Sequence, residues 1–240
     1  MPSLVFFLRL FCRPFQRSHA LPPSLCPRAG RWACAAVVLG LGATAPAHAG
    51  KSLEAAALGA LSPQARQVAD WIRSQKDNQH LPYVLIDKHA ARAHVFNAAG
   101  TLQASSPVLL GLARGDHSVP GIGERPLSAI APHERTTPAG RFLSEPGRNL
   151  QGEDIVWIDY DAAVSLHRVR ASNAAERRLQ RLASTSVADN RISYGCVNVP
   201  AHFYDRFVAP AWGKNPGLVY VLPENQSAAQ FFGFDAAPAR

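Results

Sequence analysis

The sequence predicts a mainly β domain with helices (an α+β class), arranged as a β-sandwich. Short apolar or alternating runs bounded by Gly, Pro, Asn and Asp recur after residue 82 and indicate strands. Helical periodicity is confined to a few short segments. Strands and helices do not alternate regularly along the chain, so the sequence does not favour a parallel sheet built from βαβ units.

The first 49 residues have the pattern of a secretory signal peptide. They contain five arginines and no acidic residue. Arg28 and Arg31 precede an apolar run over 32–45, and Ala47 and Ala49 occupy the small positions of an A-x-A cleavage site. We therefore expect cleavage after Ala49 and a periplasmic location. The apolar run is short and rich in Gly and Ala, so we expect no stable membrane span after cleavage.

The charge of the chain comes mostly from this leader. The chain has 25 Lys and Arg against 17 Asp and Glu, a net charge of +8. Without the five leader arginines, 20 basic residues face 17 acidic ones. That balance is ordinary for a soluble domain, so the high charge does not indicate a nucleic-acid partner.

Composition and periodicity divide the remainder into a helical N-terminal appendage (50–80), a main domain (81–224) and a C-terminal tail (225–240). In the appendage, Ser62 and Pro63 are typical of an N-cap and first helical position, and they predict a helix over 63–76. Its expected buried positions recur at helical spacing: Leu61, Ala65, Val68, Ala69 and Ile72.

The main domain is predicted to begin with strands and a hairpin. The expected strands are 83–87, 91–97, 101–112, 140–144, 154–159, 164–169 and 217–222. Residues 98–100 form the hairpin turn. The segment 113–136 is rich in Gly and Pro and long for a compact domain, which is typical of a functional loop.

Two helices are predicted in the second half. Asn173 and Glu176 are spaced as a cap-and-return pair that opens a short helix through residue 182. Its expected apolar face is Ala175, Leu179, Leu182 and Ala183, opposite Arg177, Arg178 and Arg181. A second helix is expected to begin at Pro200, with Phe203, Phe207 and Val208 directed inward.

Cys196 is the first candidate for chemistry. The other three cysteines, Cys12, Cys26 and Cys34, lie in the leader, so cleavage leaves Cys196 without an intramolecular disulfide partner. A buried structural cysteine is the alternative to a reactive thiol. An unpaired thiol is a liability in an oxidising compartment. Cys196 also follows Gly195, which lets the backbone approach a ligand closely. It precedes an expected helix start by about four residues, where partial positive charge favours a thiolate.

His167 is the candidate base. It ends the run Ala163-Val164-Ser165-Leu166-His167, so Ser165 and His167 share one strand face. The intervening segment is long enough for the chain to leave and return, so the two side chains can meet. Without Cys196, a histidine with an ordinary structural role would be the preferred interpretation.

These residues resemble a known family. Thr137-Pro138-Ala139-Gly140-Arg141-Phe142, then His167, then Ser193-Tyr194-Gly195-Cys196-Val197-Asn198 resembles the pattern of YkuD-type L,D-transpeptidases. The resemblance covers about residues 82–222 and implies a β-sandwich-like catalytic domain that acts on peptidoglycan stem peptides. We expect no cofactor.

The resemblance implies a role for each residue of the pattern. Cys196 is the nucleophile that forms a thioester, and His167 moves the proton. Backbone N–H groups around Gly195 and Cys196 stabilise the oxyanion. Ser193 holds the loop or lines the site. Asn198 fits the last position of the pattern, and a helix cap before Pro200 is the alternative for it.

Two departures from the family pattern concern neighbours of these residues. Tyr194 replaces the usual histidine of Ser-His-Gly-Cys, which changes hydrogen bonding and charge at the site. Arg168 follows His167 where a small residue is more common, and the spacing from His167 to Cys196 is longer than usual. We hypothesise that Arg168, or the arginines of the following helix, contact stem-peptide carboxylates. A solvated helix face is the alternative.

Three functions remain open on the sequence. The first is a periplasmic cysteine acyltransferase, whose acceptor is a neighbouring stem or a wall-linked protein. The second is an L,D-carboxypeptidase or amidase that passes the same thioester to water. The third is a non-catalytic wall-binding module, which the intact Cys196 and His167 argue against. No His, Cys and carboxylate cluster has metal-ligand spacing, so no metal is expected.

Overall fold

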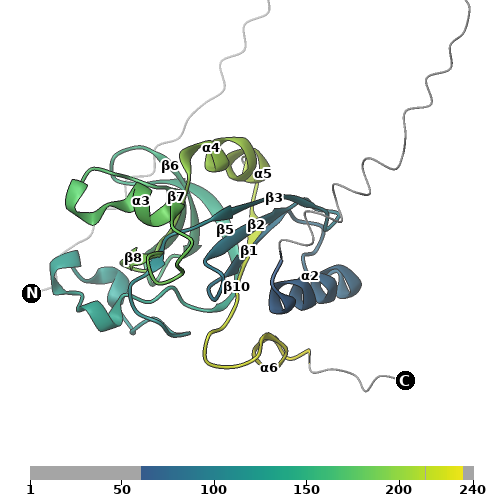
Figure 1. Ribbon diagram of the computed structural model, residues 1–240. Coiled ribbons are helices and arrows are strands. Elements are labelled where there is room, and N and C mark those ends of the chain that lie inside the picture. The colour runs from purple at the N-terminus through teal and green to yellow at the C-terminus, as the bar shows by residue number, and fades with distance from the viewer. Residues whose placement is uncertain (1–60, 214, 235–240) are drawn as a thin grey trace, which may run out of the picture. The chain divides into compact units, whose positions relative to one another are not determined.

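The computed structural model describes residues 61–213 and 215–234. The expected signal peptide and its cleavage site, the leader cysteines, residues 50–60 and the end of the tail lie outside these described residues. The described part is built on a large mixed sheet with several helices, so the predicted sheet-dominated class with helices is confirmed (Figure 1). Within it, no helix is long and apolar enough to cross a bilayer.

Eight strands form one mixed sheet in the order β3-β2-β1-β10-β5-β6-β7-β9, and β4 pairs with β8 in a second ladder. The parallel pairs among the described strands are β1–β10, β7–β9 and β4–β8. The strands are β1 Tyr83–Asp87, β2 Arg92–Phe96, β3 Leu102–Pro107, β4 Leu110–Gly111, β5 Gly140–Arg148, β6 Asp154–Asp159, β7 Val164–Arg168, β8 Arg191–Ser193, β9 Val197–Val199 and β10 Gly217–Val221.

Strand β5 connects two halves of this sheet. Its first residues, 140–144, pair with β10, and 145–148 pair with β6. Apolar side chains from both halves meet in one buried core, among them Val84, Val219, Val156 and Leu166. The two halves therefore enclose a shared core as the two layers of a sandwich do.

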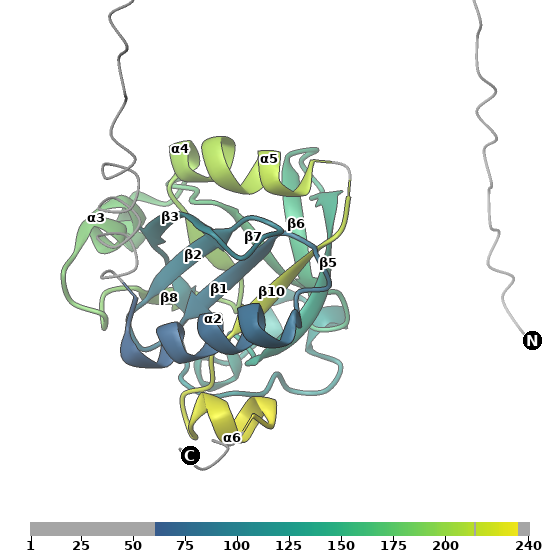
Figure 2. The same cartoon turned by 90° about the vertical axis from the view of Figure 1, so that its right-hand side faces the viewer.

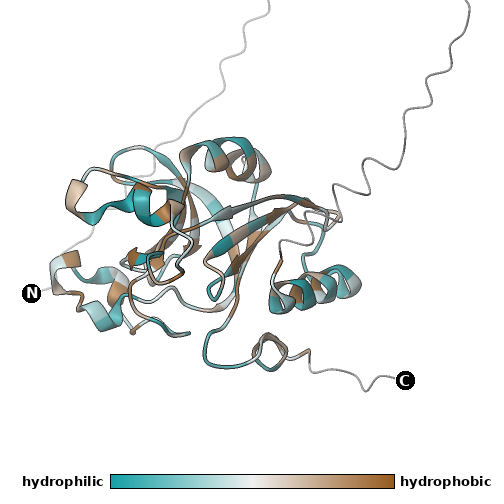
Figure 3. Ribbon diagram, in the orientation of Figure 1, coloured by the Kyte–Doolittle hydropathy of each residue, from teal (hydrophilic) through white to brown (hydrophobic). Residues whose placement is uncertain are grey.

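Helix α2 (Pro63–Gln75) covers the other face of the β1 and β10 half (Figure 2). The Ser62 hydroxyl accepts the Ala65 N–H at 3.1 Å and donates to the Asp87 carboxylate at 2.5 Å, so the predicted N-cap is confirmed. Hydrophobic and hydrophilic residues alternate along α2 (Figure 3). All five positions expected to be buried are buried: Leu61, Ala65, Val68, Ala69 and Ile72.

The remaining helices are short. They are α3 Arg178–Ala183, α4 Ala201–Phe203, α5 Ala209–Trp212 and α6 Ala228–Phe232, and a π-helical turn, Tyr204–Val208, joins α4 to α5. Phe203 and Val208 are buried as expected. Phe207 packs against the same core and is partly buried. Helix α6 lies in the segment expected to be a tail, where its Ala228 contributes to the core beside α2.

The helix expected from Asn173 through residue 182 is wrong as one continuous element. A 3-10 turn, Ala174–Glu176, is followed by Arg177 with φ +49°, and only then does α3 begin. The Asn173 side chain accepts the Ala175 N–H as a cap. The Glu176 carboxylate binds the Arg178 guanidinium and does not reach back to the Asn173 cap. Leu179 is consequently 55% exposed rather than buried.

Two further boundaries differ from the predicted ones. The strand expected over 101–112 is two strands, β3 and β4, and they belong to different ladders. Pro107 ends β3, because proline has no N–H with which to continue a ladder. Strand β5 extends to Arg148, four residues beyond its expected end, where it gains β6 as a new partner.

Candidate active site

Cys196 lies in the tight connection between β8 and β9. It is half-buried, and it is the free cysteine of the described residues. Gly195 precedes it with φ +132°, and a Cβ there would lie 2.9 Å from the Thr136 carbonyl oxygen. Both the backbone conformation and the close approach therefore require glycine. The Ser193 hydroxyl accepts the Gly195 N–H at 3.1 Å and donates to the Cys196 carbonyl at 2.6 Å, which fixes the connection.

His167 lies on β7, and its register partner on the adjacent parallel strand β9 is Asn198. The His167 Nδ1 lies 2.7 Å from the Arg168 carbonyl oxygen. A carbonyl only accepts, so Nδ1 carries the proton that it donates. The Nε2 atom lies 3.1 Å from the Asn198 side-chain nitrogen. The backbone carbonyl orients the ring, so no carboxylate is needed for this purpose.

The surroundings of the Cys196 sulfur favour its ionised form. The sulfur lies 3.6 Å from the Ser165 hydroxyl oxygen and 3.7 Å from the Ala163 carbonyl oxygen. Burial raises the pKa of the thiol. The hydrogen bond and the charge of His167, with contributions from Ser165, lower the pKa by more than burial raises it. The net pKa is below the ordinary value for cysteine, which is the condition for a reactive thiol near neutral pH.

Cys196 and His167 open onto one cleft of about 370 Å³. Leu127 comes from a 3-10 helix, Leu127–Ala129, within the segment 113–136, so that segment contributes to the cleft. Basic and acidic side chains lie on its wall. The other lining residues are Arg170, Ser172, Asn173, Glu176, Arg178, Ser193, Tyr194 and Asn198.

A smaller cavity of about 140 Å³ adjoins the site on another side of His167. Its walls include Ser165, Trp157 and Arg170. His167 and Arg170 line both spaces.

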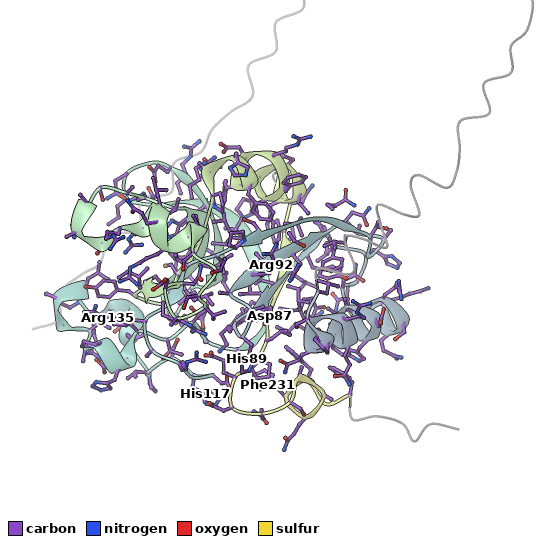
Figure 4. All side chains as sticks on the ribbon, in the orientation of Figure 1. Asp87, His89, Arg92, His117, Arg135 and Phe231 are labelled. Carbon is purple, nitrogen blue, oxygen red and sulfur yellow. The ribbon has the colours of Figure 1, made fainter. Side chains whose placement is uncertain are left out.

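Tyr194 lines the main cleft, and its ring is covered by an arginine. The Arg135 guanidinium lies 4.0 Å from the ring centre. Its Nε and Nη2 atoms also donate to the Ile130 carbonyl at 3.2 and 3.1 Å. Arg135 belongs to the irregular segment before β5, at the left of Figure 4 with α2 at the right. Tyr194 is thus joined to that segment, and the sequence alone did not predict this contact.

The structure does not bring Arg168 to the cleft. Its Nε donates to the Asp205 carboxylate at 2.8 Å, and its Nη1 donates to the Asp154 carboxylate at 2.9 Å. The guanidinium also lies 4.2 Å from the centre of the Tyr204 ring. Two carboxylates and an aromatic face therefore occupy Arg168, although it directly follows His167. Arg178, from the same hypothesis, does line the cleft.

The N–H of Gly195 is directed into the loop rather than toward the cleft, because it donates to Ser193. Gly195 also has a conformational role in this loop. Its carbonyl accepts the Thr137 hydroxyl at 2.7 Å, and the same hydroxyl oxygen accepts the Gly111 N–H at 2.9 Å. Thr137 is fully buried and ties β4 and the Cys196 loop to the start of β5.

Sequence reasoning missed the roles of Thr137, Ser165, Arg135 and Arg178. Thr137 stands at the head of the Thr-Pro-x-Gly-x-Phe pattern, so the motif contained a signal for it. Ser165 shares a strand face with His167, which places its hydroxyl beside the sulfur. Nothing local marks Arg135. Arg178 belonged to the predicted arginine face, but its bond to Asn198 was not predicted. Among residues 61–213 and 215–234, no three His, Cys, Asp or Glu side chains are grouped to hold a metal.

No protein-family model matches the sequence, and no curated protein matches it. Among solved structures, the chain is similar to the L,D-transpeptidase LdtMt1, solved in complex with imipenem, at 14% identity and a TM-score of 0.34 over 59% of this chain. It spans 58% of the length of that protein.

Two other solved structures are similar at a comparable level. The catalytic domain of the E. faecium L,D-transpeptidase has 16% identity and a TM-score of 0.33, over 59% of this chain and 96% of that domain. The helical cell shape determining protein Pgp2 from Campylobacter jejuni has 13% identity and a TM-score of 0.38, over 69% and 61% of the two chains. At these values, function has to be argued from the residues of the site itself.

Proposed function

We propose that this chain is a periplasmic cysteine acyltransferase of the L,D-transpeptidase type that acts on peptidoglycan stem peptides. The observation that carries the proposal is the pairing at the cleft. A half-buried thiol with a lowered pKa lies beside a histidine whose Nδ1–H is held by a backbone carbonyl. The order of Thr137, His167 and Cys196 along the chain supports the same assignment, because it resembles the family pattern.

In the first step, the Cys196 sulfur attacks the carbonyl carbon of the third stem residue. His167 takes the thiol proton at Nε2 and returns it to the nitrogen of the terminal D-alanine, which leaves as the free amino acid. The carbon–nitrogen bond breaks as the thioester forms, and Cys196 carries the acyl group. Tyr194 lines the cleft and is our candidate to donate its hydroxyl proton to the developing oxyanion.

In the second step, an acceptor amine attacks the thioester. His167 accepts a proton from that amine and returns it to the sulfur, so that an amide forms and the thiol is restored. A neighbouring stem or a wall-linked protein would supply the amine. Water in the same position would make the chain a hydrolase, and the chemistry up to the thioester would be unchanged.

Intact-protein mass spectrometry tests the proposal directly. Incubation with a tetrapeptide donor or a carbapenem is expected to add the mass of one acyl group to the wild type and none to Cys196→Ser. His202→Ala serves as a matched control, because His202 is an exposed histidine on α4 outside the cleft. It should acylate as the wild type does, whereas His167→Ala should acylate at least tenfold more slowly.

An unmodified wild-type protein after prolonged incubation with both reagents would overturn the proposal and favour a wall-binding module. If the adduct forms, analysis of the muropeptide products separates transfer from hydrolysis. New cross-links identify the transferase, and shortened stems without cross-links identify the hydrolase.

A further inference from the structure

A chain of hydrogen bonds runs from the segment between β7 and β8 to the imidazole ring. The Arg178 Nη1 donates to the Asn198 Oδ1 at 2.7 Å, and its Nε donates to the Glu176 carboxylate. The Arg178 side chain is 14% exposed, and Asn198 as a whole is 1% exposed. Burial keeps water from competing for these donors and acceptors, so each partner constrains the next.

The donor and acceptor roles along this chain follow from chemistry. A guanidinium has only donors, so the Asn198 atom that faces Arg178 has to be the carbonyl oxygen. The amide nitrogen of Asn198 then faces the His167 Nε2 at 3.1 Å. An amide nitrogen only donates, so Nε2 has to accept and carries no proton. The Nδ1–H bond to the Arg168 carbonyl requires the same tautomer.

We propose that Arg178 is a positioning residue that acts through Asn198 to hold His167 in its neutral form, protonated at Nδ1 alone. The catalytic meaning of this inference rests on the proposed function. A base must begin the reaction without the proton it is to accept, and Arg178 favours that state. Imidazolium formation breaks the Asn198 bond, because Nε2–H and the amide N–H are both donors.

One consequence follows for the proposed reaction. The imidazolium formed during attack has lost a hydrogen bond, so it is a stronger acid toward the leaving amine.

Other charged groups near the ring do not supply this constraint. Arg170 lines the cleft, but its guanidinium binds Glu153 and Gln151. Hydrogen bonds from Asn149 and Arg170 lower the pKa of the Glu153 carboxylate. Tyr194 and Cys196 complete the titratable groups at this wall of the cleft. Among the described residues, Arg178 is the cation bonded to Asn198.

The test compares the wild type with the double variant Glu176→Gln/Arg178→Met. This pair removes one charge of each sign, so the net charge at the site stays the same. The Asn198 amide is then able to rotate and offer its oxygen to a protonated Nε2. We expect the nitrogen resonances of His167 to titrate to imidazolium about one pH unit higher, which is roughly a tenfold change in the imidazolium population. The pH midpoint of Cys196 alkylation should move downward.

Two single variants guard against a merely structural effect. Arg178→Lys retains a cationic donor and should keep the wild-type titration. Asn198→Asp offers an acceptor to Nε2–H while Arg178 remains, so it should shift the His167 titration upward as the double variant does. Arg177→Gln is the control for loss of a neighbouring charge, since the structure shows no bond from Arg177 to Asn198 among the described residues. It should titrate as the wild type does.

Unchanged His167 titrations in both the double variant and Asn198→Asp would overturn the inference, even where acylation of Cys196 is normal. The tautomer and the titration of His167 are measurable without substrate. A failure of the proposed acyl transfer would therefore leave the Arg178 result standing by itself, and the two failures are distinguishable.

Discussion

The Arg135 guanidinium lies 4.0 Å from the centre of the Tyr194 ring, which joins the segment 113–136 to the loop that carries Cys196. Arg135 is itself held by the Ile130 carbonyl, within the same segment. Leu127 of this segment lines the cleft. The contact therefore connects the position of one cleft wall to the residue directly before Gly195.

We expect Arg135→Gln to loosen this connection. A cation over an aromatic face contributes about 0.5–1 kcal/mol at a partly exposed site, so amide hydrogen exchange should accelerate in 127–136 and in 193–196 together. Tyr194→Phe keeps the ring and is expected to exchange as the wild type does. Faster exchange confined to residues around position 135, with the Cys196 loop unchanged, would contradict the connection.

The lowered pKa of Cys196 predicts how its reactivity depends on pH. A lowered pKa means that the thiolate persists to lower pH than in an ordinary cysteine, so the iodoacetamide rate should reach half its maximum below the ordinary value. His167→Ala removes the main interactions that lower the pKa and leaves burial, which raises it. The midpoint should therefore move upward by one pH unit or more, roughly tenfold in rate near neutral pH.

His202→Ala is the control for that experiment, because it removes an exposed histidine that does not line the cleft. Its alkylation profile should superimpose on the wild type. A His167→Ala midpoint at or below the wild-type value would contradict the assigned cause of the shift.

Thr137→Val is expected to destabilise the domain without changing side-chain shape. The substitution removes the hydroxyl that bridges the Gly195 carbonyl and the Gly111 N–H, and leaves both buried groups without that partner. Each such loss costs about 1–3 kcal/mol, so the free energy of unfolding should fall by at least that amount in urea titrations. In the control variant Thr101→Val, at the partly exposed hairpin, the free energy of unfolding should fall by less than about 0.5 kcal/mol.

Lys88→Met should be among the most damaging substitutions outside the cleft. The ammonium group is fully buried and lies 2.9 Å from the Asp116 carboxylate, 3.0 Å from the Thr137 carbonyl and 2.5 Å from the Gly115 carbonyl. Methionine fills similar volume but leaves the buried carboxylate without its cation, at a cost of about 3–5 kcal/mol. Thermal or urea unfolding measures the loss, and the exposed Lys76→Met should leave stability nearly unchanged.

Local sequence patterns predicted the parts of this fold whose structure is determined locally. Helix α2 and strands β1, β6 and β7 lie where periodicity and caps indicated. The short strands β8 and β9 were missed, because three residues show no period and both strands are defined by parallel partners far along the chain. The break in the helix at Arg177 was missed because the Glu176 carboxylate binds Arg178 rather than the Asn173 cap, as the spacing had suggested.

The candidate site divides in the same way. Cys196 and His167 were identifiable from residue type, spacing and the resemblance to a family. The Thr137–Gly195 bond spans 58 residues and the Arg178–Asn198 bond spans 20, so neither is visible in a local window. Arg168 shows the converse case, in which neighbours in sequence lie apart in space. It follows His167 directly on β7, so its side chain lies on the opposite face of the strand from the His167 side chain.

The register of β7 and β9 has a consequence for how this family of sites can vary. His167 and Asn198 face each other as direct partners on neighbouring strands, and one residue further back Leu166 faces Val197. The backbone ladder thereby sets the separation of the reacting groups, and the 28 residues between His167 and Cys196 do not. Provided that Arg178 keeps its bond to Asn198, that crossover can lengthen, shorten or exchange the rest of its helical content while the strand register stays constant. This makes it a natural point for new specificity to be inserted.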